Sequence, residues 1–460
     1  MFFSQKYRSI TAIIVSVALY FLFAYDLDRT NFYQLTTLYI SLLIPFFYFI
    51  RKENNHFSFL VAIAILFRLT FLFAIPNLSQ DFYRFIWDGR MILEGLNPYI
   101  SLPQTYIEQR SFPIPQAVEL YAGMGDLNGS HYTNYPPVNQ LCFLMAAIFS
   151  NSSILGAVIV MRLQIILADI GIIYFGKKIL EQLHLPVHYI FLYILHPFII
   201  IELTGNLHFE PVMLFFLVWS LHLLLQKKWI WAAVVLGLSV SVKLIPLLFL
   251  PLFFQWFTTT PAYQAQGNKA INIIKGFLRF ISFGMLVIII NMLLFLPFLS
   301  SELISSYTNS VGLWFRNFEF NASLYYIARE IGYLFRGWNE IAIIGKIMPG
   351  IAVIFLAMIT FFRNNTSPQQ LITALLLGLT FYYFTTTTMH PWYLATLVLL
   401  SVFTKYRYPI VWSVAIILSY QAYANDPWKE NLWFVGIEYM IVFGMLFWEL
   451  RPLKKQERLK

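Results

Sequence analysis

Long apolar stretches recur along the whole chain, and they constrain its fold more than any other feature of the sequence. Hydrophobic residues fill 59% of the 460 positions and charged residues only 12%, whereas a soluble domain carries about 25% charged residues. An α-helix needs about 20 apolar residues to cross a hydrocarbon core of about 30 Å. Backbone groups in lipid must pair within their own segment, and the runs lack the alternation of a membrane β-barrel. The sequence therefore predicts an all-α integral membrane protein.

Charge and cysteine content narrow the possible partners. The 31 Lys and Arg residues exceed the 22 Asp and Glu residues, giving a net charge of +9. Inward-facing loops rich in basic residues account for this excess, so we expect no nucleic-acid partner. The single cysteine, Cys142, permits neither an intrachain disulfide nor a cysteine-based metal site. The apolar run behind Lys6 and Arg8 lacks a small-residue cleavage pattern, so we interpret it as a first span rather than a signal peptide.

The positions of the basic residues predict an orientation with both termini in the cytoplasm and about twelve transmembrane helices. The expected spans cover residues 9–25, 32–50, 57–76, 154–176, 187–203, 209–226, 273–299, 340–362, 371–388, 391–404, 408–424 and 432–450. Residues 138–150 are too short to cross, and 229–257 form a helical hairpin broken at Lys243. Residues 1–460 then make one polytopic membrane domain with long outer loops at 77–137 and 300–339.

The first long outer loop is predicted to open with a short amphipathic helix. At 100° per residue, Asp81, Arg84 and Asp88 share one face of residues 81–95, next to an apolar stripe that begins at Phe82. Such a helix lies in the interface plane, with its apolar face toward lipid or the bundle. A carboxylate at a helix N-terminus is stabilised in its ionised form, as a general base requires. The alternative is that Asp81 only caps the helix.

Polar groups near membrane depth are costly, which makes them functional candidates. In the predicted topology the candidates gather on the outer side: Asp81, Arg84, Asp88, Arg90, His208, Lys243, Arg316 and His390. Each also has a structural interpretation, because Lys243 can extend its amine to an interface and the histidines and Arg316 can be cap or loop residues. For Arg68, Arg162 and Asp169, within the spans, a structural role is favoured.

An ordered set of short motifs gives the chain a family resemblance from about residue 77 onward. The motifs are Asp81, residues 83–90 (YRFIWDGR), 94–99 (EGLNPY), 135–137 (YPP), 205–208 (GNLH), 242–246 (VKLIP) and 390–394 (HPWYL). In this order they resemble the GT-C glycosyltransferases, and above all the polyprenyl-phosphate-mannose-dependent mannosyltransferases. Those include bacterial and mycobacterial enzymes and the first mannosyltransferase of GPI-anchor synthesis. The first 55 residues lie outside the resemblance.

The resemblance implies an active site on the outer face. An aspartate of the first large outer loop, matched here by Asp81, acts as base on the acceptor hydroxyl, and the sugar inverts as polyprenyl phosphate departs. The family often has a second acidic residue just before this aspartate, whereas this chain has Ser79 and Gln80. That departure argues against a bound metal, so no cofactor is expected.

The departing phosphate needs cations or hydrogen-bond donors placed where its charge develops. We expect donor-phosphate or substrate binding from Arg84, Asp88, Arg90, His208, Lys243, Arg316 and His390. The aromatic content of 19% suits a groove for isoprene units, although aromatic residues also gather at both interfaces of ordinary membrane proteins.

Two other functions remain as alternatives: an O-antigen polymerase or ligase acting on lipid-linked sugars, and a secondary transporter. Transporters share the span count and broken helices, but the chain shows no internal symmetry and has a long first outer loop. The expected partners of the transferase are a polyprenyl-phosphate-linked sugar, a glycan or glycolipid acceptor and membrane lipids. The expected location is a bacterial plasma membrane, with the site facing the periplasm or exterior.

Overall fold

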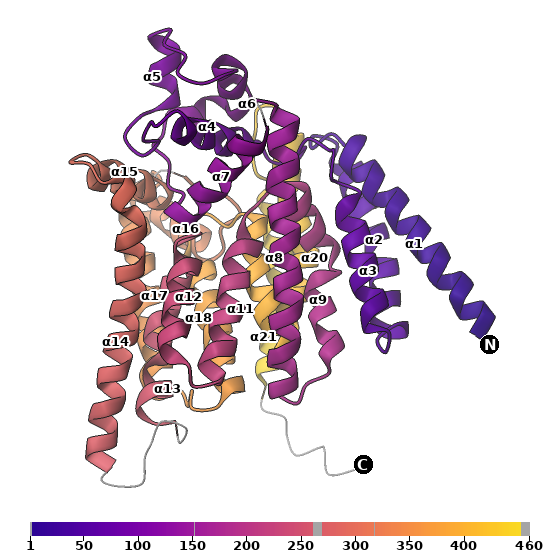
Figure 1. Cartoon of the computed structure of the whole chain (residues 1–460), viewed down its shortest axis with the longest axis vertical. Coiled ribbons are helices and arrows are strands. Elements are labelled where there is room, and N and C mark those ends of the chain that lie inside the picture. Colours follow the sequence, from indigo (N-terminus) through magenta and orange to yellow (C-terminus); the bar gives the residue numbers. More distant parts are fainter. Residues whose placement is uncertain (1, 151, 261–268, 317, 452–460) are drawn as a thin grey trace.

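A computed structural model describes residues 2–150, 152–260, 269–316 and 318–451 (Figure 1). Within these ranges the regular structure is helical, apart from one isolated bridge between Phe320 and Thr388. The predicted all-α fold is confirmed. Figure 1 shows the long helices running side by side, with α4, α5, α6, α7 and α15 gathered at one end of the bundle.

The α-helices follow one another with short 3-10 or π segments between some of them. They are α1 (Phe2–Tyr25), α2 (Phe32–Lys52), α3 (Phe57–Leu69), α4 (Asp81–Leu93), α5 (Pro103–Glu108), α6 (Ala117–Gly129), α7 (Pro137–Ser150), α8 (Ile154–Gln182), α9 (Phe191–Ile194), α10 (Pro197–Ile199), α11 (Glu210–Leu225), α12 (Trp229–Val240), α13 (Phe254–Thr258), α14 (Lys269–Phe295), α15 (Leu303–Arg316), α16 (Leu324–Arg336), α17 (Ile341–Phe362), α18 (Pro368–Thr385), α19 (Leu394–Val402), α20 (Tyr408–Ala415) and α21 (Leu432–Leu450). The intervening segments are η1 (Val187–Ile190), η2 (Ile200–Gly205), η3 (Ile245–Phe253), η5 (Leu296–Phe298), η6 (Pro391–Tyr393) and η7 (Ile416–Ala424).

Fewer helices are long and apolar enough to cross a membrane than the sequence predicted. Among the described residues six qualify, in α1, α2, α8, α14, α17 and α21, and a pair bent by 52° at residues 187–205 makes a seventh if counted as one span. The chain is a multi-pass membrane protein by this measure. The expected number of about twelve is not confirmed, because several of the expected spans are helices of 10–17 residues or broken segments.

Breaks in the helices are compensated by buried arginines. The π segment η2 ends at Gly205, where carbonyl groups lose their intrahelical partners. Arg162 on α8 donates to the carbonyl oxygens of Thr204 and Gly205, both at 2.9 Å, and to that of Leu72 at 3.0 Å. Irregular backbone is tolerated at membrane depth when other groups of the protein supply its hydrogen bonds, as Arg162 does here. Arg162 therefore has the structural role that the sequence favoured.

A second buried arginine joins two helices directly. Arg68 on α3 pairs with Asp169 on α8 at 2.7 Å, and both side chains are almost fully buried. Its guanidinium also donates to the carbonyl of Ile194 at 2.8 Å. Because a buried charge without a partner is strongly destabilising, this pair fixes the packing of α3 against α8.

The helix α4 packs inside the cluster of helices at the end of the bundle. Phe85 stacks on Phe143 of α7, with ring centroids 4.6 Å apart. A Cβ at Gly89 would lie 2.2 Å from the carbonyl oxygen of Phe143, so this close approach requires glycine. Nine of the thirteen residues of α4 are buried, and α4 therefore packs within protein rather than lying along an interface.

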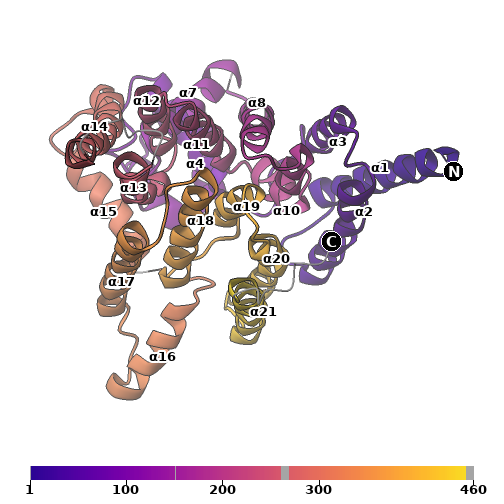
Figure 2. The same ribbon diagram turned by 90° about the horizontal axis from the view of Figure 1, so that it is seen from below.

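A different helix of the outer loops exposes an apolar face. In α16 the side chains of Leu334 and Phe335 are 84% and 83% exposed, and Figure 2 shows this helix projecting away from the helices around it. The predicted second outer loop thus contains an amphipathic helix with an apolar surface that no other described segment covers.

Candidate functional site

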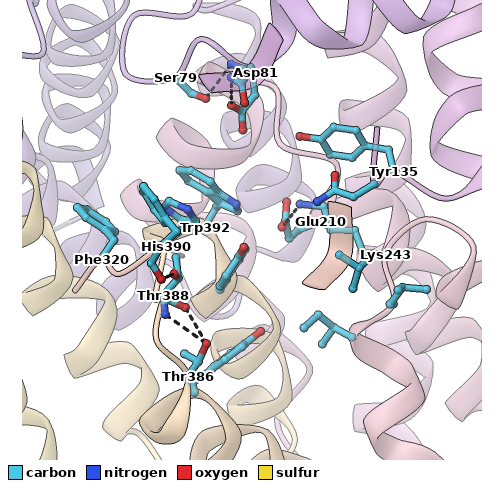
Figure 3. Close-up of a pocket in the computed structure, with 18 of the residues that line it drawn as sticks. Ser79, Asp81, Tyr135, Glu210, Lys243, Phe320, Thr386, Thr388, His390 and Trp392 are labelled. Atoms are coloured by element: carbon cyan, nitrogen blue, oxygen red, sulfur yellow. Dashed lines mark hydrogen bonds and ion pairs between the residues drawn. The ribbon is translucent and has the colours of Figure 1, made fainter. Parts of the chain in front are cut away.

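A cavity of about 570 Å³ lies where α4, α11, α12 and the segments around η6 and η7 meet (Figure 3). Charged residues on its wall are Arg29, Asp81, Glu210 and Lys243. Aromatic residues and one imidazole make up much of the rest: Tyr135, Phe318, Phe320, Tyr382, Tyr383, His390, Trp392, Tyr393, Tyr423 and Trp428. The cavity therefore joins a charged region to a broad apolar wall.

Asp81 is the first residue of α4 and faces the cavity. The N-cap position belongs to Gln80, and no side-chain capping bond is present there. The Asp81 carboxylate instead accepts a hydrogen bond from Asn128 Nδ2 of α6 at 3.4 Å. Of the two interpretations offered by the sequence, the geometry favours a carboxylate directed at the cavity over a helix cap.

The surroundings of Asp81 change the pKa of its carboxyl group. Burial raises the pKa of this carboxyl above its usual value, Lys243 and the hydrogen bond from Asn128 oppose the rise, and Glu210 adds to it. A carboxyl with a raised pKa binds a proton more strongly, which suits a general base. Asp81 thus presents a carboxyl group with a raised pKa at the wall of the cavity.

Lys243 lies at the break between α12 and η3, where the sequence predicted an interrupted helix. Its amine forms an ion pair with Glu210, the first residue of α11. The helices α11 and α12 form an antiparallel hairpin, so the start of one is next to the end of the other. The start of α7 reaches the same place, because the Val138 amide donates to the Ser241 carbonyl at 2.9 Å.

Two histidines enclose Trp392. The ring of His208 stacks on one side with centroids 3.9 Å apart, and that of His390 lies 4.5 Å away, tilted by 5°. His390 and Trp392 line the cavity, whereas His208 lies behind them. Burial, with a contribution from Lys243, lowers the pKa of His390 to about 3. His390 is therefore neutral near pH 7 and supplies polarity rather than positive charge.

Arg84, Asp88 and Arg90 do not line the cavity. Arg84 pairs with Asp88 at 2.8 Å and donates to the carbonyls of Asn128 and His131. Asp88 also accepts from Gln140 Nε2 at 2.9 Å. These contacts tie α4 to α7 and to the end of α6.

Arg90 also connects α4 to neighbouring segments by hydrogen bonds. It donates to the carbonyl oxygens of Pro115 and Ser152, at 2.6 and 2.7 Å, and to the side chain of Gln116. The last predicted residue, Arg316, ends α15, and its side chain lies outside the described part of the structure.

The loop after α15 supplies one wall of the cavity. Phe320 exchanges backbone hydrogen bonds with Thr387 and Met389, at 3.1 and 2.8 Å. The neighbouring Asn321 is fixed by Glu430, which accepts from its backbone amide at 2.6 Å, and by Glu438, which accepts from its side chain at 3.2 Å. The loop that carries Phe320 is thus anchored to the strand-like segment at residues 387–389 and to α21.

Glu210 and Arg29 are cavity residues that sequence reasoning missed. Glu210 lies two residues after His208, and the hairpin of α11 and α12 brings it to Lys243. Arg29 belongs to the turn between α1 and α2, in the part of the chain outside the motif resemblance. Among the described residues, no group of three His, Cys, Asp or Glu side chains is arranged to hold a metal ion.

The polytopic helical fold, together with a cavity that combines a carboxylate, a paired lysine and an aromatic wall, has the features of a membrane-embedded glycosyltransferase. The family follows from the sequence: residues 28–259, half of the chain, match the alpha-(1->6)-mannopyranosyltransferase N-terminal domain of the MptA_B family. The chain belongs to this family and is a GT-C mannosyltransferase. No curated protein and no solved structure matches it.

Proposed function

We propose that this mannosyltransferase takes mannose from a polyprenyl-phosphate-linked donor and transfers it, with inversion, to a glycan or glycolipid acceptor. The observation that carries the proposal is the cavity in which Asp81, the Lys243–Glu210 pair and an aromatic wall meet. A lipid-linked donor has a polar sugar phosphate and an apolar chain, and both kinds of surface are present on the wall.

Asp81 is the proposed general base. The acceptor hydroxyl gives its proton to the Asp81 carboxylate as its oxygen forms a bond to C1 of mannose. The bond from C1 to the phosphate oxygen breaks, and its electron pair leaves with polyprenyl phosphate. The raised pKa of Asp81 favours this proton transfer, because a base is most effective when its pKa approaches the working pH.

The negative charge that develops on the leaving phosphate requires nearby positive charge. Lys243 is the proposed partner from the end of α12, and Glu210 orients its amine through their ion pair. His390, neutral and at the cavity wall, is placed to exchange hydrogen bonds with the sugar or acceptor rather than to neutralise charge.

The family name specifies an α-(1→6) linkage, and we propose the same linkage here. An inverting enzyme that makes an α-linked product requires a β-linked donor. The stereochemistry of donor and product therefore forms a direct test of inversion.

The proposed orientation places the cavity on the outer side of a bacterial plasma membrane. Basic residues cluster toward the other end of the bundle: Gln5 donates to the Lys52 carbonyl at 3.2 Å, and Lys177 lies 5.0 Å from the ring of Phe57. Under the positive-inside rule that end faces the cytoplasm, and the helices α4–α7 with the cavity face outward (Figure 1).

The experiment uses purified protein in lipid nanodiscs with synthetic β-linked and α-linked polyprenyl-phospho-mannose, and a nucleotide-linked mannose as the comparison donor. We expect transfer from the β-linked lipid donor alone and an α-linked product by NMR. Transfer only from the nucleotide donor would refute the proposed donor. A product that keeps the donor's anomeric configuration would refute inversion and the single-base mechanism.

A further inference from the structure

We propose that Arg29 binds the phosphate of the lipid-linked donor, so that the hairpin of α1 and α2 contributes directly to the substrate site. This inference rests on the proposed function and extends it to a segment that the motifs do not include.

The turn that carries Arg29 is held in place beside the segment leading to Asp81. Asn77 donates from Nδ2 to the carbonyl oxygens of Phe23 and Leu27, both at 2.8 Å. Asp28 stabilises the turn itself by accepting from the amide and hydroxyl of Thr30, both at 2.9 Å. Residues 78–81, which follow Asn77, line the cavity together with Arg29. The position of Arg29 at the wall therefore follows from fixed backbone contacts.

The charges on the cavity wall leave Arg29 available to an anion. Lys243 shares its charge between Glu210, its ion-pair partner, and the leaving phosphate, and the carboxylate of Asp81 is the proposed base. None of the ion pairs within the described ranges includes Arg29. Arg29 is half-buried, and an arginine keeps its charge at all physiological pH values. An incoming anion would thus meet a cation that none of these ion pairs engages, with the exposed Asp28 as the carboxylate next to it in the chain.

The chemistry of the guanidinium suits the phosphate of the proposed donor. Its planar set of N–H groups matches two phosphate oxygens at once, a geometry that lysine does not offer. The Arg29 guanidinium carbon lies 5.1 Å from the centre of the Tyr423 ring, and stacking of this kind leaves the edge of the guanidinium free to donate.

The surroundings of Arg29 suit the lipid part of the same ligand. Tyr423 and Trp428 line the cavity near it, and Phe320 packs against both rings at 6.2 and 6.1 Å. A phosphate bound by Arg29 would therefore have apolar aromatic surface beside it for the first isoprene units. A membrane phospholipid presents a similar phosphate, and the experiment must separate the two sources.

The chain offers a matched control for the test. Arg51, at the other end of α2, is exposed, lies 5.9 Å from the ring of Phe47 and does not line the cavity. R51M removes the same charge and the same kind of ring contact as R29M. R29K keeps the charge of Arg29 but not its planar set of donors.

The measurement is the binding of a polyprenyl monophosphate, and of the matching polyprenol without phosphate, to each protein in nanodiscs of phosphatidylcholine, repeated in nanodiscs that also contain phosphatidylglycerol. Hydrogen bonds to charged groups support an expected loss of about 10- to 100-fold in phosphate-ligand affinity for R29M. We expect an intermediate loss for R29K, none for R51M, and no change in polyprenol binding for any variant. Thermal unfolding without ligand should be the same for wild type and R29M, and R29K supplies the affinity comparison if R29M unfolds earlier.

Several outcomes would overturn the inference: equal affinity in R29M and wild type, an equal loss in R51M, an equal loss for polyprenol, or no binding by wild type. A loss that occurs only in nanodiscs containing phosphatidylglycerol would assign Arg29 to membrane headgroups instead. Mannose transfer by wild type is assayed separately. Phosphate binding through Arg29 without any mannose transfer would refute the proposed function and leave the inference standing.

Discussion

Two sets of charged residues lie within the same region of the molecule, and they differ in how their charges are satisfied. Arg84, Asp88 and Arg90 are buried among helices α4–α7, where carbonyl groups, an amide side chain and each other provide their partners. Asp81 and Lys243 instead border a cavity. Asp81 and Asp88 come from one short helix, seven residues apart, yet only one of them faces space that a substrate can fill.

The difference shows that the charged residues of one motif can have different roles. The surroundings of each residue decide whether it holds helices together or binds a ligand. A buried charge that is paired with other groups of the protein fixes the packing of helices, because removing either partner leaves the other unpaired in a medium of low polarity. A charge at a cavity wall has capacity left for a ligand. The following predictions test this division.

The largest expected effect is loss of transfer in D81N. Asparagine has the shape of aspartate but cannot accept the proton, so we expect kcat to fall by about 10²- to 10⁴-fold with the unfolding temperature nearly unchanged. D126N, at an exposed aspartate of α6, is the control and should transfer normally. If D81N transfers mannose at the wild-type rate, Asp81 is not the base.

The matched substitution D88N should act on stability instead. It leaves the buried Arg84 without its charge partner, which costs about 3–5 kcal/mol for a buried pair. We expect a clearly lower unfolding temperature and poorer yield in a membrane preparation, with transfer per folded molecule close to wild type. A D88N protein that is stable but no longer binds the donor would support the substrate-binding role of Asp88 that the sequence predicted.

A smaller effect is expected for E210Q, in the pH dependence of transfer. Glu210 raises the pKa of Asp81 and Lys243 lowers it, so removing the Glu210 charge lowers that pKa. Because the base must be deprotonated, activity is lost as pH falls through the pKa of Asp81. The acidic limb of kcat/KM should therefore move to lower pH in E210Q. An unchanged acidic limb of the kcat/KM profile would show that Glu210 does not influence the pKa of the base. A limb that moves to higher pH would contradict the expected effect of Glu210 on the pKa of Asp81.

The smallest effect is expected for W392F. Both faces of Trp392 are covered by imidazoles, so neither face is open for a sugar ring to stack on it. Loss of the larger ring should cost about 1 kcal/mol of stability and leave KM for the acceptor almost unchanged. A large rise in KM for the acceptor, measured beside Y382F at another part of the wall, would show that Trp392 contacts substrate directly.

The fold could be predicted from the sequence where a helix is both long and apolar. Residues 154–176 and 432–450 were expected as spans and lie in α8 and α21. The predicted count of about twelve is not confirmed, because short helices buried inside a bundle have the same apolar composition as spans. The helix α11, with sixteen residues of which eleven are buried, illustrates this ambiguity, which apolar content alone does not resolve.

The candidate site was predicted in part. Asp81, Lys243 and His390 were expected on one side of the membrane, and the structure brings all three to one cavity. The spacing of Arg84 and Asp88, four residues apart on a helix, was itself a signal of an internal ion pair. Arg29 could not have been found by motif, because its role depends on how the turn at residues 26–31 packs against the segment before Asp81.

The division of the cavity wall between the two halves of the chain bears on how such enzymes diversify. Among the residues that the structure describes, every charged residue on the wall lies within the matched region 28–259, whereas the described wall residues from Val311 to Trp428 are uncharged and mostly aromatic or threonine. The charged groups of the described wall thus come from the matched region, and most of its aromatic surface comes from the second half of the chain. Evolution can alter the second half to admit a new acceptor while the first half continues to perform the same reaction, and chimeras that exchange second halves between relatives could acquire new acceptors.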